Sequence, residues 1–212
     1  MRKFAPLFAV LLAVATAGLA KASVMVTLDG YPQGITDGSA FVGPAILTID
    51  GTEYSAVCYD ALDKASINEM WNANVYGMVD LNLGAYFINQ NDYAHKYEQV
   101  SYLSTLFSLG NENQWVDIQH TIWSVFDPSG YTADPNLIIQ ANNAINSGYD
   151  FSPFRYIDSP PNSNPLVQGF IVDNPNIGLN PGPEPATWFL LCSGFLLMAA
   201  WNLRRRYASR KA

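Results

Sequence analysis

The sequence contains few of the residues from which disulfides, metal sites and catalytic triads are built. It has two cysteines, Cys58 and Cys192, and two histidines, His95 and His120. No H-E-x-x-H, G-x-S-x-G, glycine-rich phosphate loop or paired-cysteine metal motif occurs in it. These absences argue against the usual hydrolases and metalloenzymes. We therefore expect no enzyme, no catalytic residue, no cofactor and no metal.

Positive charge is scarce between residues 23 and 185. This segment holds all 18 acidic residues of the chain but only three basic ones, Lys64, Lys96 and Arg155, which gives it a formal net charge of −15. The whole-chain value of −7 hides this separation. Because binding to nucleic acid depends on cationic side chains, we expect no nucleic-acid partner.

The N-terminus has the three parts of a secretory signal. Two basic residues precede an apolar run over residues 4–17, and a short A-K-A triplet that ends at Ala22 fits the A-x-A cleavage pattern. The run is shorter than the roughly 20 residues that span a bilayer. We predict a signal peptide over residues 1–22, cleaved after Ala22, with Ala17 as the alternative cleavage site.

The C-terminus pairs a second apolar run with basic residues that follow it. The run over residues 186–203 carries no charge and is long enough to span a membrane. Cations placed directly after a span hold that end in the cytoplasm, so the preceding body lies outside. The flanking residues are Pro183, Glu184 and Pro185 before the span, and Arg204, Arg205 and Arg206 after it.

Residues 23–173 predict one α+β domain with a helical insertion between two groups of strands. Alternating or β-prone runs predict strands over 24–28, 45–49, 52–59, 154–157 and 169–172. Asp50-Gly51 predicts a hairpin turn between the second and third of these strands. Apolar spacings of three and four predict helices over 92–109, 114–126 and 135–146. Residues 174–182 have the composition of a flexible linker.

Cys58 is alone in the segment that we expect to be exported, because Cys192 lies in the predicted span. Helical spacing places Trp115 and Trp123 four residues before and after Gln119, so this glutamine lies on an aromatic stripe. A thiol beside a carboxamide in a dry pocket has one defined reaction. The thiolate attacks the amide carbon, ammonia leaves, and an internal thioester joins the two side chains.

The motifs around Cys58 and Gln119 resemble the two signatures of thioester domains, also called TQXA domains, on the surface of Gram-positive bacteria. Val57-Cys58-Tyr59-Asp60 matches the first signature, and residues 118–123 match the second except that Thr121 replaces alanine. The resemblance covers about residues 24–172. It implies a β-sandwich with a helical insertion, a Cys58–Gln119 crosslink supported by Asp60, Trp115 and Trp123, and a covalent adhesin that captures an amine on a surface ligand.

The tail resembles the PEP-CTERM sorting signal of Gram-negative bacteria that make exopolysaccharide. The resemblance rests on the Pro183-Glu184-Pro185 motif, the apolar span and the arginine cluster over residues 183–212. It implies a transient stay in the inner membrane and recognition by an exosortase. That transpeptidase would cut near the motif and place the protein on the cell surface or in the extracellular matrix.

Two other functions remain open at this point. The chain can be a structural, polysaccharide-associated surface protein without a thioester. Cys58 would then be a small buried apolar residue, Gln119 would hydrogen-bond to backbone, and Trp71, Trp115 or Trp123 could stack on sugars. An enzyme comes last. A glycosidase needs two carboxylates at a set separation in space. The acids that could form such a pair are Asp60, Asp80, Glu98 and Asp117.

Overall fold

The computed structural model describes residues 23–83, 85, 87, 89–108, 112–160, 162–163 and 166–177. These residues belong to one compact unit, Ser23–Leu179. The predicted signal peptide, the sorting motif, the span over 186–203 and most of the predicted linker lie outside the described residues. Among the described helices, none has the length and apolar character needed to cross a membrane.

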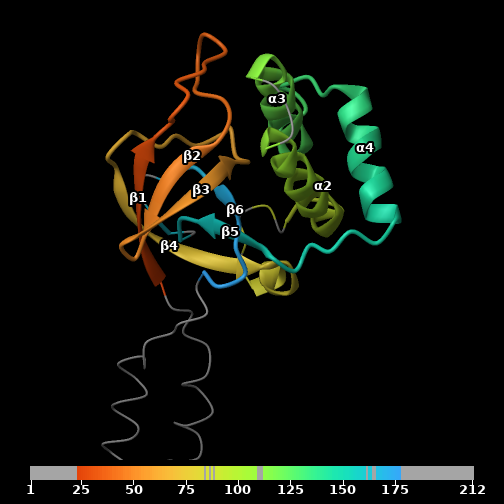
Figure 1. The fold of residues 1–212 in the computed structure, drawn as a ribbon. Coiled ribbons are helices and arrows are strands. Elements are labelled where there is room, and N and C mark those ends of the chain that lie inside the picture. The colour runs from red at the N-terminus through yellow and green to blue at the C-terminus, as the bar shows by residue number, and fades with distance from the viewer. Residues whose placement is uncertain are drawn as a thin grey trace, which may run out of the picture. The chain divides into compact units, whose positions relative to one another are not determined.

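Six antiparallel strands close into one barrel, in the order β1-β2-β3-β6-β5-β4 (Figure 1). β1 pairs with both β2 and β4, while β3 pairs with β6, so every one of these strands has two neighbours. The strands are β1 (Ser23–Gly30), β2 (Ala45–Ile49), β3 (Thr52–Cys58), β4 (Met70–Gly77), β5 (Phe154–Asp158) and β6 (Phe170–Asp173). Closure removes exposed sheet edges.

The expected mixture of strands and helices is confirmed, whereas the expected β-sandwich is wrong. A sandwich needs two separate sheets, but the pairing of β1 with β4 and of β3 with β6 joins all six strands into one closed sheet. In addition, β4 has no counterpart among the predicted strands. Its outward residues include Asn72 and Asn74, which are poor strand formers, although Trp71 and Ala73 on its inner face are buried.

Three α-helices connect β4 to β5 and lie together on one side of the barrel (Figure 1). They are α2 (Tyr93–Thr105), α3 (Trp115–Phe126) and α4 (Pro135–Asn146). Three short 3-10 helices flank them, η2 (Met78–Leu83), η3 (Leu106–Ser108) and η4 (Glu112–Gln114). α2 stops earlier than predicted because its last turn tightens into η3. α4 begins as predicted, since the side chain of Asp134 accepts a hydrogen bond from the N–H of Asn136 and Pro135 occupies the first turn.

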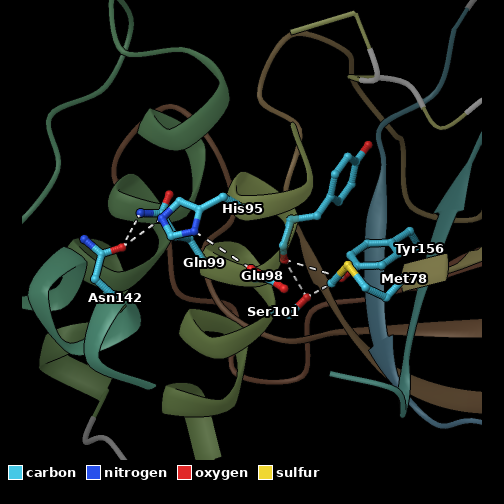
Figure 2. A network of polar contacts seen from close by, with 8 residues as sticks. Met78, His95, Glu98, Gln99, Ser101, Asn142 and Tyr156 are labelled. Carbon is cyan, nitrogen blue, oxygen red and sulfur yellow. Dashed lines mark hydrogen bonds and ion pairs between the residues drawn. The ribbon is translucent and has the colours of Figure 1, made fainter. Parts of the chain in front are cut away.

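Polar contacts fix α2 against both α4 and the barrel (Figure 2). On one face of α2, Asn142 Oδ1 accepts a hydrogen bond from Gln99 Nε2 at 2.9 Å and lies 3.1 Å from His95 Nε2. On the other face, the buried hydroxyls of Ser101 and Tyr156 lie 2.6 Å apart and join α2 to β5. The helical layer is therefore tied to the barrel by a satisfied buried contact.

The most deeply placed helix, α3, is positioned next to the end of β3. Nine of its 12 residues are buried, so most of the surface of α3 is covered by other parts of the domain. The connection between β1 and β2 also reaches α3, through a hydrogen bond from Gly43 to Gln119. Three parts of the chain, the end of β3, the β1–β2 connection and α3, consequently meet at one point.

Candidate functional site

The structure brings Gln119 of α3 against Cys58 at the end of β3. The Gln119 side chain is fully buried, and its Nε2 donates to the carbonyl oxygen of Cys58 at 2.7 Å. Its Oε1 accepts from the backbone N–H of Gly43 at 3.2 Å. The carboxamide is thus held from both ends, by two segments that are 61 and 76 residues away in the sequence. Such a fixed orientation is what a reaction between neighbouring groups requires.

The thiol of Cys58 is buried among polar neighbours that include Trp123, Asp60 and Gln168. Sγ donates to the backbone carbonyl of Asp60 at 2.9 Å and accepts from the indole N–H of Trp123 at 3.4 Å. Burial raises the pKa of Cys58 far above its ordinary value, and the nearby Asp60 carboxylate adds to this effect, while the Trp123 N–H opposes it. The resting side chain is therefore a thiol, with little thiolate present.

Gly43 fits its place only because it has no side chain. Its φ of +93° lies in the left-handed region, and an added Cβ would approach Cε3 of Trp115 to 2.5 Å. Trp115 is 7% exposed and also packs edge-on against Phe107. Trp115 therefore supports the site indirectly, by forming the surface on which the Gly43 backbone rests. The Gly43-Pro44 pair is a turn signal in the sequence, but nothing in it points to Gln119.

Asp60 is buried below the thiol. Its carboxylate accepts from the backbone N–H of Leu62 at 2.8 Å, and its carbonyl oxygen accepts from Gln168 Nε2 at 2.8 Å as well as from Cys58. Burial raises the pKa of Asp60 to about 7, with the charge of Asp63 contributing. Gln168 was not among the predicted site residues. It lies in a loop before β6, and no spacing or motif distinguishes it.

Thr121, the residue that departs from the thioester signature, is accommodated without disturbing the pair. Its side chain is fully buried. The hydroxyl donates to the carbonyl of Asp117 at 2.7 Å and accepts from the N–H of Asp134 at 2.9 Å. Both partners belong to the α3–α4 side of the residue, so the hydroxyl is satisfied away from Cys58 and Gln119.

A cavity of about 540 Å³ opens beside Trp123. Four aromatic side chains line it, Tyr31, Phe41, Trp123 and Tyr131, together with polar groups that include Gln168. Tyr31 and Phe41 stack with ring centroids 4.8 Å apart, and Trp123 and Tyr131 meet at 4.8 Å. Neither Cys58 nor Gln119 lines this cavity; it adjoins the pair through Trp123, whose indole N–H contacts the sulfur of Cys58.

The four acids considered for a glycosidase pair lie in four different segments of the fold. Asp60 is buried beside Cys58, Asp80 lies in η2, Glu98 is on α2 and Asp117 is on α3. The carboxylate that influences Asp60 from the barrel is Asp158, which is hydrogen-bonded to the hydroxyl of Tyr59. Within the described ranges, no group of three His, Cys, Asp or Glu side chains is arranged to hold a metal ion.

Comparison with known proteins adds no family to these observations. No family model, no curated protein and no solved structure matches the chain.

Proposed function

We propose that the folded domain carries an internal thioester between Cys58 and Gln119 and serves as a covalent adhesin on the cell surface. The observation that supports this most directly is the pair of hydrogen bonds that orient the Gln119 carboxamide. Its oxygen accepts from the N–H of Gly43, and its nitrogen donates to the carbonyl oxygen of Cys58. Any buried carboxamide needs such partners, and these two hold that of Gln119 beside the buried residue Cys58.

These contacts support the following route of bond formation. The Cys58 sulfur attacks the side-chain carbonyl carbon of Gln119, the C–N bond breaks, and the nitrogen leaves as ammonia with the thiol proton. Negative charge that develops on Oε1 faces the N–H of Gly43, which is the arrangement of an oxyanion-stabilising donor. Because burial leaves little thiolate on Cys58, close alignment must supply most of the acceleration.

Intact mass of the purified full-length chain tests the thioester. We expect a mass lower than that of the unmodified protein by one ammonia, and addition of one methylamine when that amine is supplied. Cys58→Ala and Gln119→Ala should each have the unmodified mass and ignore methylamine. A wild-type chain of unmodified mass that does not react with methylamine would remove this function.

A non-covalent, polysaccharide-associated surface protein is the second candidate, favoured by the four aromatic rings of the cavity beside Trp123. Cys58→Ala separates the two functions, because a non-covalent binder would remain on a polysaccharide column without the thiol. If the variant elutes while the wild-type chain stays bound through denaturing washes, attachment depends on the covalent bond.

We also propose export and sorting of the domain by the two ends of the chain. The N-terminal segment over 1–22 would direct secretion, and an exosortase would act at Pro183-Glu184-Pro185 after the span over 186–203 has entered the inner membrane. Replacing Pro183 and Glu184 by alanine should leave the protein in the membrane fraction. Normal release of that variant would contradict the assignment.

A further inference from the structure

The cavity beside Trp123 is walled by several connections of the chain that meet at one place. Tyr31 and Phe41 come from the β1–β2 connection, and Tyr131 comes from the segment between α3 and α4. Most residues between 61 and 67, in the connection from β3 to β4, complete the wall. Its volume of about 540 Å³ lies within the range of about 300–1,000 Å³ that is typical of sites for small organic ligands.

The aromatic rings of this cavity offer π faces to a ligand. Phe41 is 39% exposed, and the ring of Tyr31 stacks on it with an interplanar angle of 10°. Tyr131 lies against the buried ring of Trp123 at an angle of 56°. The face of an aromatic ring carries partial negative charge, so it attracts cations as well as apolar groups. The rings alone therefore fit either a cation or a sugar, and the charged groups of the wall have to decide.

The fixed charge in the cavity wall is negative. Asp63 lines the cavity, and its Oδ2 is buried without a hydrogen-bond partner among the described residues. A buried carboxylate oxygen that no donor satisfies is costly. Lys64 also lines the cavity, but it is exposed, so its long side chain can carry the ammonium group into water. A ligand with a positively charged N–H would compensate both the charge and the missing donor at Asp63.

Other carboxylates strengthen the negative potential around the cavity. Asp60 lies close enough to Asp63 for the two charges to influence each other. Burial, followed by the charges of Asp37 and Asp127, raises the pKa of Tyr131 in the cavity wall. The formal net charge of −15 over residues 23–185 also concentrates cations at the surface of the domain. A cation is therefore favoured over a neutral or an anionic ligand.

We propose that the cavity beside Trp123 is a non-covalent binding site for a small protonated alkylamine. The N–H of the ligand donates to the carboxylate of Asp63, and its alkyl groups pack on the rings of Phe41 and Tyr131. No bond is made or broken. The site goes beyond the proposed thioester and does not depend on it, because neither Cys58 nor Gln119 lines the cavity.

Three probes of similar size, offered to the full-length chain at constant ionic strength, separate charge from hydrogen bonding and shape. Trimethylammonium has a charge and one N–H, tetramethylammonium has only the charge, and tert-butanol is neutral. The indole N–H resonance of Trp123, assigned with Trp123→Phe, follows each titration by NMR. We expect trimethylammonium to bind most tightly and tert-butanol to bind about tenfold more weakly or worse. A tertiary amine forms no amide with a thioester, so Cys58→Ala should bind the same probe equally well.

Substitutions in the wall test each contact. Asp63→Asn should weaken trimethylammonium binding by about tenfold, the effect of losing a hydrogen bond to a charged group. Glu53→Gln is the matched control, because it removes an exposed acid of β3 outside the cavity, and it should leave binding unchanged. Phe41→Leu keeps an apolar side chain without a ring and should weaken binding by about two- to fivefold, the range for exposed cation–π contacts. Lys64→Gln should tighten binding, because it removes an opposing charge.

The outcomes separate this site from simple attraction by net charge. Equal weakening by Asp63→Asn and Glu53→Gln would overturn the site, and so would weaker binding after Lys64→Gln or a preference for methyl glucoside over the cation. If Asp63→Asn does not fold, Lys64→Gln and Phe41→Leu decide the question from the exposed part of the wall. A chain of unmodified mass that still binds trimethylammonium would remove the thioester and leave this inference standing. An intact thioester without such binding would do the reverse.

Discussion

Replacing Gly43 by alanine should damage the domain more than replacing any other glycine of similar backbone conformation. Two costs add at this position. A left-handed φ of +93° costs a residue with a Cβ about 1–2 kcal/mol. The new methyl group would also lie 2.5 Å from Cε3 of Trp115, and relieving such overpacking in a core costs about 1–3 kcal/mol. We therefore expect Gly43→Ala to lower the free energy of unfolding by about 2–5 kcal/mol.

Gly38→Ala is the control that separates these two costs. Gly38 has nearly the same φ, +96°, but a Cβ added there would have no other atom within 4 Å. It should lose only the conformational part, about 1–2 kcal/mol. Urea unfolding followed by tryptophan fluorescence measures both variants, and intact mass reports the thioester. We expect Gly43→Ala, but not Gly38→Ala, to lower the fraction of chains that have lost one ammonia by forming the thioester. Equal losses of stability would refute the role assigned to the Gly43–Trp115 contact.

Three further substitutions test the surroundings of the pair. Thr121→Ala should lower the free energy of unfolding by about 1 kcal/mol, because the Asp134 N–H loses its acceptor, yet should leave the thioester mass unchanged; loss of the thioester would contradict this. Burial raises the pKa of Asp60 from 3.8 to about 7, so the stability that its protonated form provides at low pH should disappear as the pH rises from about 4 to about 7. Asp60→Asn should flatten that part of the urea-unfolding profile, and an unaltered slope would show that other groups cause it. Trp123→Phe keeps a ring but removes the N–H donor to Cys58, and intact mass should show a smaller thioester fraction; an unchanged fraction would make that donor dispensable.

Local patterns in the sequence were sufficient to predict the strands and helices that have one buried face. Val24, Val26 and Leu28 alternate with outward residues and form β1, and the interval between Pro135 and Gly148 contains α4. The same patterns predicted Cys58 near the end of a strand and Gln119 in a helix between Trp115 and Trp123. The structure places them in contact through the Cys58 carbonyl.

Contacts between residues that are far apart in the sequence could not be predicted from local sequence patterns. Closure of the barrel comes from two strand pairs, β1 with β4 and β3 with β6. The strands β2 and β3 separate the first pair in the sequence, and β4, the helices and β5 separate the second. The Gly43 N–H meets Gln119 across 76 residues, and Asp37 meets His120 across 83. Such contacts follow from the assembled fold, so neither Gly43 nor Asp37 could be chosen from its neighbours in the sequence.

The pairing of β6 with β3 gives the site a mechanical position in the chain. β6 is the last strand of the described residues, and its two paired residues on the β3 side include Phe170, whose partner is Cys58 itself. A pull on the chain beyond Asp173 therefore loads both neighbours of β6, namely β5 through four residue pairs and β3 through two pairs, one of which contains Cys58. A crosslink from Cys58 to Gln119 would pass that load into α3, so that strand and helix would resist tension together.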